Sequence, residues 1–160
     1  MEPRLNPYQA APSVYKAMMG LGAQVNNHSG LDVTLLNLVY MRASQINHCA
    51  FCLDMHSKEA RAHGETEQRL YCLEGWRESP FYTDRERAAL AWTEAVTVVT
   101  DGFVPDCVFD EVRPHFSDAE LANLTLAIIA INGWNRLNVA FRTIGGTYRV
   151  PEPSAKAQLA

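Results

Sequence analysis

The segment from Ser117 to Phe141 constrains the fold of this 160-residue chain more than any other. It opens with the pattern S-D-A-E at Ser117, a capping box that satisfies backbone N–H groups at the start of a helix. Apolar residues then lie on nearly all sides of the expected helix, which must therefore be covered by other segments. Its most apolar part, residues 121–131, has only about half the length that crosses a bilayer. We therefore expect a helix in the core of a folded domain, with a bend at Asn132-Gly133.

Helical spacing of apolar residues recurs along the rest of the chain. The sequence predicts further helices over 13–25, 32–45, 49–64, 66–73, 83–99 and 105–114. Alternating strand patterns, glycine-rich phosphate loops and repeats of fixed period are all missing from the sequence. The prediction is an all-α fold of about seven helices, in a single domain that spans residues 1–160.

Both ends of the chain are expected to lie outside these helices. Residues 1–12 contain three prolines and few periodic apolar residues, which predicts an arm rather than a helix. Such an arm needs a surface to pack on, for example a neighbouring subunit. At the other end, Gly145-Gly146 is expected to follow the last helix, and residues 146–160 are predicted to form a loose tail.

Composition excludes several classes of partner. The formal net charge is −4 and no basic block or stripe is present, which argues against nucleic acid and anionic membranes. The apolar fraction of 48% is too high for a disordered chain. The first residues lack the apolar run of a signal peptide, so we expect a cytoplasmic protein.

The chemistry of the sequence is concentrated in Cys49, Cys52 and His56. On a continuous helix these three side chains fall within about 60° of one another, on one narrow stripe. Cysteines at positions i and i+3 can form a disulfide, and a histidine four residues further on can contact the second sulfur. In a cytosolic protein a C-x-x-C pair is more often catalytic or metal-binding than structural. The pattern therefore predicts a redox dithiol with its own acid–base group.

A thiol reacts as its thiolate, and the predicted position of Cys49 and Cys52 in a first helical turn favours negative charge. His56 lies one turn from Cys52 and can take its proton, which favours Cys52 as the attacking thiol. Thioredoxin-type dithiols use the N-terminal cysteine instead, so the order of the two cysteines stays open. The isolated Cys72 and Cys107 are expected to be small buried residues.

Zinc binding is the alternative use of the same residues. On one continuous helix Cys49 and His56 are about 10 Å apart along the axis, too far to share one tetrahedral ion. A second C-x-x-C or H-x-x-x-H pair is also missing from the sequence. Zinc is therefore disfavoured, and we expect no bound metal or cofactor.

The run from Arg42 to His56, R-A-S-Q-I-N-H-C-A-F-C-L-D-M-H, resembles the core motif of the alkylhydroperoxidase AhpD-like family. That family belongs to the carboxymuconolactone decarboxylase superfamily, and residues 86–95 and 131–138 resemble its members as well. The resemblance implies an all-helical domain that assembles as a homotrimer or homohexamer. The implied activity is reduction of a hydroperoxide by the two cysteines, or of a disulfide in the service of a peroxiredoxin. The lactone decarboxylases of the superfamily lack the paired cysteines, so decarboxylation is disfavoured.

The resemblance also implies roles for individual residues. It assigns Cys49 and Cys52 as the redox pair and His56 as the proton-relay histidine. One position departs from the family pattern, because Asn37 stands where the best-studied members have a relay glutamate, twelve residues before the first cysteine. An amide does not accept a proton at neutral pH. Either the relay is weaker here or another carboxylate takes its place, and Glu94 is the candidate that the sequence offers.

Two functions from different classes follow. The leading hypothesis is a thiol-dependent peroxidase or disulfide reductase, with an external lipoyl-type or thioredoxin-type dithiol as reductant and a lipoyl-bearing protein or peroxiredoxin as partner. The alternative is a non-catalytic redox-sensing or interaction module, whose cysteines oxidise only to change the binding of a partner.

Overall fold

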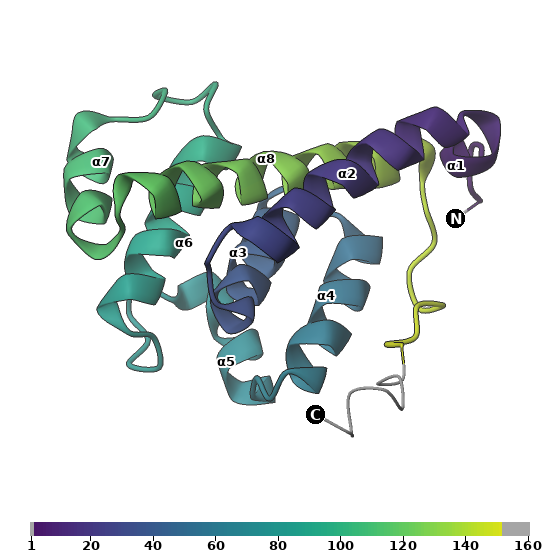
Figure 1. Cartoon of the computed structure of the whole chain (residues 1–160). Coiled ribbons are helices and arrows are strands. Elements are labelled where there is room, and N and C mark those ends of the chain that lie inside the picture. Colours follow the sequence, from purple (N-terminus) through teal and green to yellow (C-terminus); the bar gives the residue numbers. More distant parts are fainter. Residues whose placement is uncertain (1, 152–160) are drawn as a thin grey trace, which may run out of the picture.

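The computed structural model describes residues 2–151, which fold into eight α-helices and two short 3₁₀ turns (Figure 1). The first four helices are α1 (Pro7–Ala10), α2 (Pro12–His28), α3 (Val33–Ile46) and α4 (Ala50–Ala62). The others are α5 (Glu67–Tyr71), η1 (Leu73–Gly75), α6 (Asp84–Thr97), α7 (Asp106–Val112), η2 (Arg113–His115) and α8 (Asp118–Phe141).

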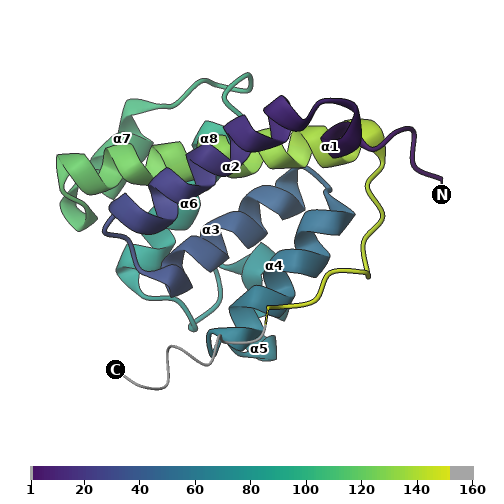
Figure 2. The same cartoon turned by 45° about the vertical axis from the view of Figure 1, so that its right-hand side comes forward.

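Helix α3 lies at the centre, where it packs against α4, α6 and α8 (Figure 2). Helix α8 runs across the whole domain with α2 alongside it. One apolar cluster joins α3 and α6 to α7 and α8, and includes Val39, Leu124 and Ile128. A second cluster joins α3 and α6 to α4 and α5, and includes Leu38 and Leu90. Because α3 contributes to both clusters, its C-terminal end, where the dithiol motif begins, is held from several sides.

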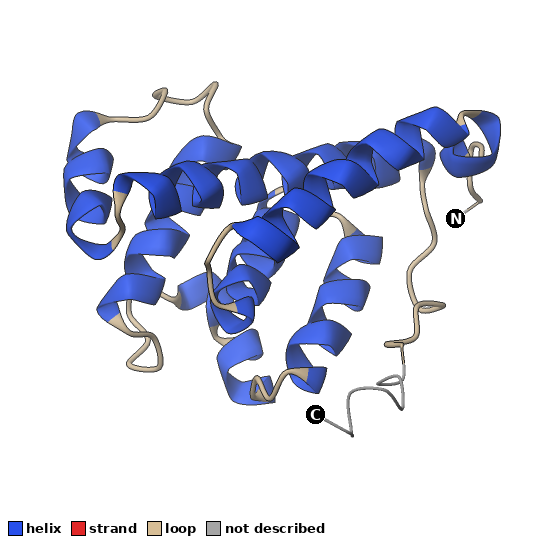
Figure 3. Ribbon diagram, in the orientation of Figure 1, coloured by secondary structure: helices blue, strands red, loops and turns tan. Residues whose placement is uncertain are grey.

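Among the described residues no strand is found, so the prediction of an all-α fold is confirmed (Figure 3). The number of helices is close to the expected seven, and the additional one is α1. Across 2–151 no helix is long and apolar enough to cross a membrane.

Helix α8 continues without interruption through Asn132-Gly133, where the sequence had suggested a bend. Gly133 instead allows a close approach of α2, because a Cβ atom there would lie 2.8 Å from the Met18 methyl carbon. Leu124 and Ile128 are fully buried as expected, whereas Ile129 on the opposite side is 52% exposed.

The predicted N-terminal arm contains one helical turn, α1, which corrects the expectation of an arm without a helix. Asn6 accepts hydrogen bonds from two backbone N–H groups at the start of this turn, and Pro7 at its first position has a backbone already suited to a helix. The arm packs on its own chain, with the Arg4 backbone N–H donating to the carbonyl oxygen of Phe141 at 3.0 Å.

The C-terminal segment after α8 runs back along α4. The Gly146 N–H donates to Asp54 at 2.9 Å, and the Lys58 ammonium donates to the carbonyl oxygen of Tyr148 at 3.1 Å. A Cβ at Gly145 would lie 3.2 Å from the Ala50 carbonyl oxygen, so the backbone is pressed against the start of α4. The part of the predicted tail up to Pro151 is therefore held against α4, and 152–160 lie outside the described residues.

Candidate active site

The dithiol lies at the break between α3 and α4. Asn47 ends α3, and His48 turns the chain with a left-handed φ of 52°. Cys49 is the N-cap of α4, so it stands just outside the helix rather than in its first turn as the sequence predicted. Cys52 and His56 lie on α4 at the predicted spacing. The two sulfurs still meet, because a side chain at the N-cap reaches over the first turn.

Cys49 and Cys52 are free thiols with their sulfur atoms 2.6 Å apart, and each residue is only 1% exposed. The hydrogen bond from Cys52 lowers the pKa of Cys49 to about 7 against the opposing effect of burial. The backbone N–H groups of Cys52 and Phe51 and the side chain of Asn135 act in the same direction. The same hydrogen bond, together with burial, raises the pKa of Cys52. These shifts favour Cys49 as the thiol that ionises first, whereas the proximity of His56 to Cys52 favoured Cys52.

The lowered pKa of Cys49 predicts a pH dependence for its reactivity. Since only the thiolate is nucleophilic, the rate of sulfenic acid formation by the reduced protein should fall about tenfold per pH unit below about 7 and level off above it. Stopped-flow mixing with hydroperoxide across a pH series checks this, in a C72S/C107S background that leaves only the pair. A rate that still climbs through pH 8 and 9, as for an ordinary thiol with a pKa of about 8.5, contradicts the assignment.

Helix α8 faces the dithiol with asparagines. Asn135 is fully buried, donates to Ser44 Oγ at 3.1 Å and accepts from Asn47 at 2.9 Å. Asn138 donates through Nδ2 to Cys52 Sγ at 3.5 Å, and its Oδ1 accepts from the Tyr8 hydroxyl at 3.0 Å. Neither asparagine was expected at the site from the sequence. Their signal was the spacing of three residues, which places polar side chains on one stripe of an otherwise apolar helix.

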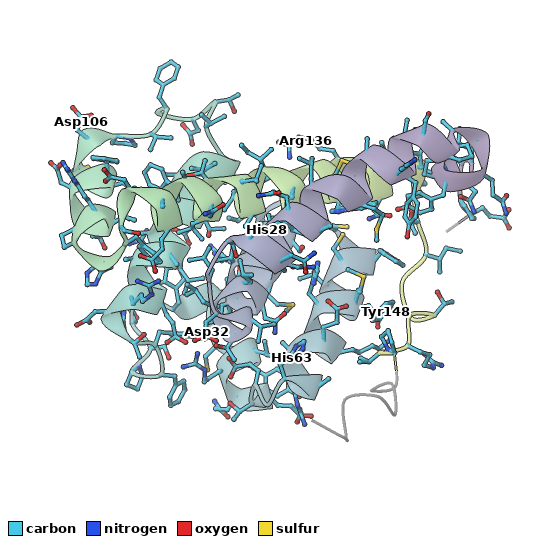
Figure 4. All side chains as sticks on the ribbon, in the orientation of Figure 1. His28, Asp32, His63, Asp106, Arg136 and Tyr148 are labelled. Carbon is cyan, nitrogen blue, oxygen red and sulfur yellow. The ribbon has the colours of Figure 1, made fainter. Side chains whose placement is uncertain are left out.

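His56 is buried, and its partner is a carboxylate from its own helix. Nδ1 of His56 lies 3.1 Å from Oε2 of Glu59, and the Tyr148 hydroxyl donates to Oε1 of Glu59 at 2.6 Å. In Figure 4, Tyr148 lies on the C-terminal segment beside α4. A carboxylate accepts the proton of Nδ1, and this tautomer leaves Nε2 free to act as a base.

The pKa values of Glu59 and Tyr148 fit their hydrogen bonds with each other and with His56. Burial acts to raise the pKa of Glu59, but hydrogen bonds from His56 and Tyr148 outweigh it, so its pKa lies below the ordinary value. Burial and the Glu59 carboxylate raise the pKa of Tyr148 to about 12, which keeps its hydroxyl as a donor. Glu59 was not found from the sequence, although a glutamate three residues after a histidine on a helix is a recognisable signal.

Asn37 and Glu94, the two positions considered from the sequence for the relay carboxylate, have partners other than His56. Asn37 is 4% exposed, and its amide Nδ2 lies 3.3 Å from Nδ1 of His63, at the far end of α4 from the cysteines. Glu94 accepts hydrogen bonds from Arg42, Trp76 and Arg77 at 2.8–2.9 Å, and none of these three residues belongs to the site. The charge of Glu94 is paired with two arginines, and the carboxylate that contacts His56 is Glu59.

The other two cysteines are less buried than expected. Cys72 is half-buried and Cys107 is exposed, so the expectation of two buried residues was wrong. Over the described range 2–151, no group of three or more His, Cys, Asp or Glu side chains is arranged to hold a metal ion.

Comparisons with known proteins agree with this fold and motif. The sequence model of the carboxymuconolactone decarboxylase family matches residues 12–95, which include the dithiol, His56 and Glu59. The uncharacterised protein YdfG of Bacillus subtilis (strain 168) is 41% identical over 140 residues, covering 88% of this chain and 95% of that protein.

Two solved structures extend the comparison. ATU0492 from Agrobacterium tumefaciens, a protein of unknown function named as a candidate AhpD antioxidant-defence protein, is 46% identical, with a TM-score of 0.88. The match covers 92% of this chain and all of that one. The debrominase Bmp8 shares the fold with a TM-score of 0.77 at 22% identity, over 87% of this chain and 74% of that one. The chain belongs to the carboxymuconolactone decarboxylase family and, within it, to the AhpD-like proteins.

Proposed function

We propose that the protein is a thiol-dependent peroxidase, with Cys49 as the attacking thiol and Cys52 as the thiol that resolves it. The observation that carries the proposal is the asymmetric pair. The two sulfur atoms lie 2.6 Å apart, and their contact lowers the pKa of Cys49 while it raises the pKa of Cys52. Such a pair is suited to two-step oxidation, in which a thiolate reacts first and a second thiol closes a disulfide.

In the first step the Cys49 thiolate attacks one oxygen of a hydroperoxide. The oxygen–oxygen bond breaks, Cys49 becomes a sulfenic acid, and the leaving alkoxide takes a proton from water to give an alcohol. In the second step the Cys52 sulfur attacks the sulfenic sulfur, and the hydroxyl group leaves as water. The raised pKa of Cys52 means that this step needs a base. His56 lies one helical turn from Cys52 and is held by Glu59, so we assign it that role.

An external dithiol completes the cycle. Its thiolate attacks one sulfur of the Cys49–Cys52 disulfide, and its second thiol then displaces the protein from the mixed disulfide. This restores both protein thiols and releases an oxidised reductant. Each of the two cysteines is only 1% exposed. Attack by a protein-bound dithiol therefore requires neighbouring residues to move first.

The test is a steady-state assay of the purified full chain with alkyl hydroperoxide, in which consumption of dihydrolipoamide or of a thioredoxin-type dithiol is measured. A peroxidase turns over many times per protein molecule, at a rate proportional to protein concentration. Oxidation of a single equivalent followed by arrest identifies the redox-sensing alternative. A chain whose thiols do not oxidise with peroxide, but which reduces a peroxiredoxin disulfide, is a disulfide reductase.

A further inference from the structure

A row of two hydrogen bonds joins Tyr8, near the N-terminus, to Cys52 by way of Asn138, near the end of α8. The Tyr8 hydroxyl donates to Asn138 Oδ1 at 3.0 Å, and Asn138 Nδ2 donates to Cys52 Sγ at 3.5 Å. Tyr8 lies on α1 and Asn138 on α8, and neither falls within residues 12–95, where the family model matches. The mechanism proposed above assigns no role to either residue.

We propose that Tyr8 is a positioning residue for the dithiol, which acts by fixing the Asn138 amide so that its N–H group points at Cys52. The proposal rests on the assignment of Cys49 as the attacking thiol. With Cys49 ionised, every donor in the row then points the same way. The hydroxyl of Tyr8 donates to the amide, and the amide donates to Cys52. The Cys52 sulfur lies 2.6 Å from that of Cys49, and once Cys49 is a thiolate the Cys52 S–H is the donor left for this contact.

The orientation of the amide matters because an asparagine side chain can present either its oxygen or its nitrogen. If the oxygen faced Cys52, it would accept the Cys52 S–H proton and compete with the Cys49 thiolate for it. Asn138 is 3% exposed, so its oxygen has little access to water and depends on the Tyr8 hydroxyl for a donor. Hydrogen bonds aligned in one direction also strengthen one another in a site of low dielectric constant.

Few other groups near the dithiol could fix the orientation of the Asn138 amide. On the side of the arm, the ionisable neighbours are Tyr8 from α1 and Tyr15 from α2; burial raises the pKa of Tyr8, so its hydroxyl stays protonated. Helix α8 faces the pair with amides, Asn135 and Asn138, and α4 itself carries His56 one turn away.

The packing of the Tyr8 ring allows the role of its hydroxyl to be tested separately. The Tyr8 ring lies 4.9 Å from the Tyr15 ring and 6.1 Å from that of Trp134, between ring centres. Y8F keeps these contacts and removes only the hydroxyl. Y15F removes a neighbouring hydroxyl that makes no hydrogen bond to the site, and is the matched control.

In a C72S/C107S background, thiolate absorbance against pH reports the ionisation of Cys49. We expect Y8F to raise the midpoint by about half a pH unit, which slows reaction with hydroperoxide about threefold at pH 6 and leaves it unchanged at pH 9. N138A should shift the midpoint by up to about one unit. The double variant should match N138A alone, because Tyr8 acts through Asn138.

A Y8F titration that coincides with wild type overturns the inference, as does an equal shift in Y15F or a loss of rate that is the same at every pH. A wild-type protein with no thiolate near pH 7 overturns it as well. The titration needs no turnover. A midpoint that shifts as expected in a protein without peroxidase activity would therefore contradict the proposed function and leave this inference standing.

Discussion

Replacement of Cys49 by serine is expected to lower peroxide turnover by about 1,000-fold or more, because it removes the thiolate that attacks the peroxide. A serine hydroxyl is almost fully protonated at neutral pH and is a far weaker nucleophile. The side chain is 1% exposed and differs from serine only in its sulfur, so the fold should persist. The measurement is steady-state peroxide consumption, with circular dichroism to check folding.

Cys52→Ser and Cys72→Ser complete this comparison. C52S should still react once with peroxide and should accumulate a Cys49 sulfenic acid that dimedone traps, because no neighbouring thiol can resolve it. C72S should behave as wild type, since Cys72 ends α5 and its sulfur accepts a hydrogen bond from Gln68 at 3.4 Å. If C49S keeps its first reaction with peroxide and C52S loses it, the assigned order of the cysteines is wrong.

Glu59→Gln is expected to slow turnover by about 10- to 100-fold while leaving the first reaction of Cys49 with peroxide within about twofold of wild type. Glutamine has nearly the size of glutamate, but its amide N–H₂ can donate to Nδ1 of His56. That favours the tautomer with a proton on Nε2, which can no longer act as a base. Disulfide formation by Cys52 should then become the slow step, and the sulfenic acid should live longer.

The control for E59Q is Glu94→Gln, which changes the carboxylate that was the relay candidate from the sequence. Glu94 is held by Arg42, Trp76 and Arg77, so its loss should lower the midpoint of thermal unfolding and leave the lifetime of the sulfenic acid unchanged. Rapid-quench trapping with dimedone measures that lifetime in both variants. A longer lifetime in E94Q, or an unchanged one in E59Q, would show that His56 is not oriented by Glu59.

The helices were predictable because their signals are local. Capping boxes at Thr83 and Ser117 begin α6 and α8 where the sequence placed them, and each box is present in full. Helix α1 was missed because the prolines of the arm were interpreted as breaking a helix, whereas a proline at the first position favours the start of one. The continuity of α8 through Gly133 was also missed. This glycine allows α2 to pack closely, and α2 lies far away in the sequence.

The site was predictable in part. C-x-x-C-x-x-x-H lies within one helix and its N-cap, so spacing was enough to place Cys49 beside Cys52 and His56 one turn further along α4. The order of the thiols was not predictable from spacing, because the pKa of each depends on burial, on the other sulfur and on amides from α8. Location in the cytoplasm, the external reductant and assembly into trimers or hexamers stay predictions.

The sequence by itself determined the helices, the dithiol and the family, since each rests on residues a few positions apart. Only the tertiary structure decided what surrounds the dithiol. Tyr148 reaches Glu59 across 89 residues, Asn138 reaches Cys52 across 86, and Tyr8 reaches Asn138 across 130. Helical periodicity states which face of a helix is polar, but not which distant segment that face meets. The hydrogen bonds from Tyr148 to Glu59 and from Tyr8 to Asn138 exist only once both ends of the chain have packed against α4 and α8.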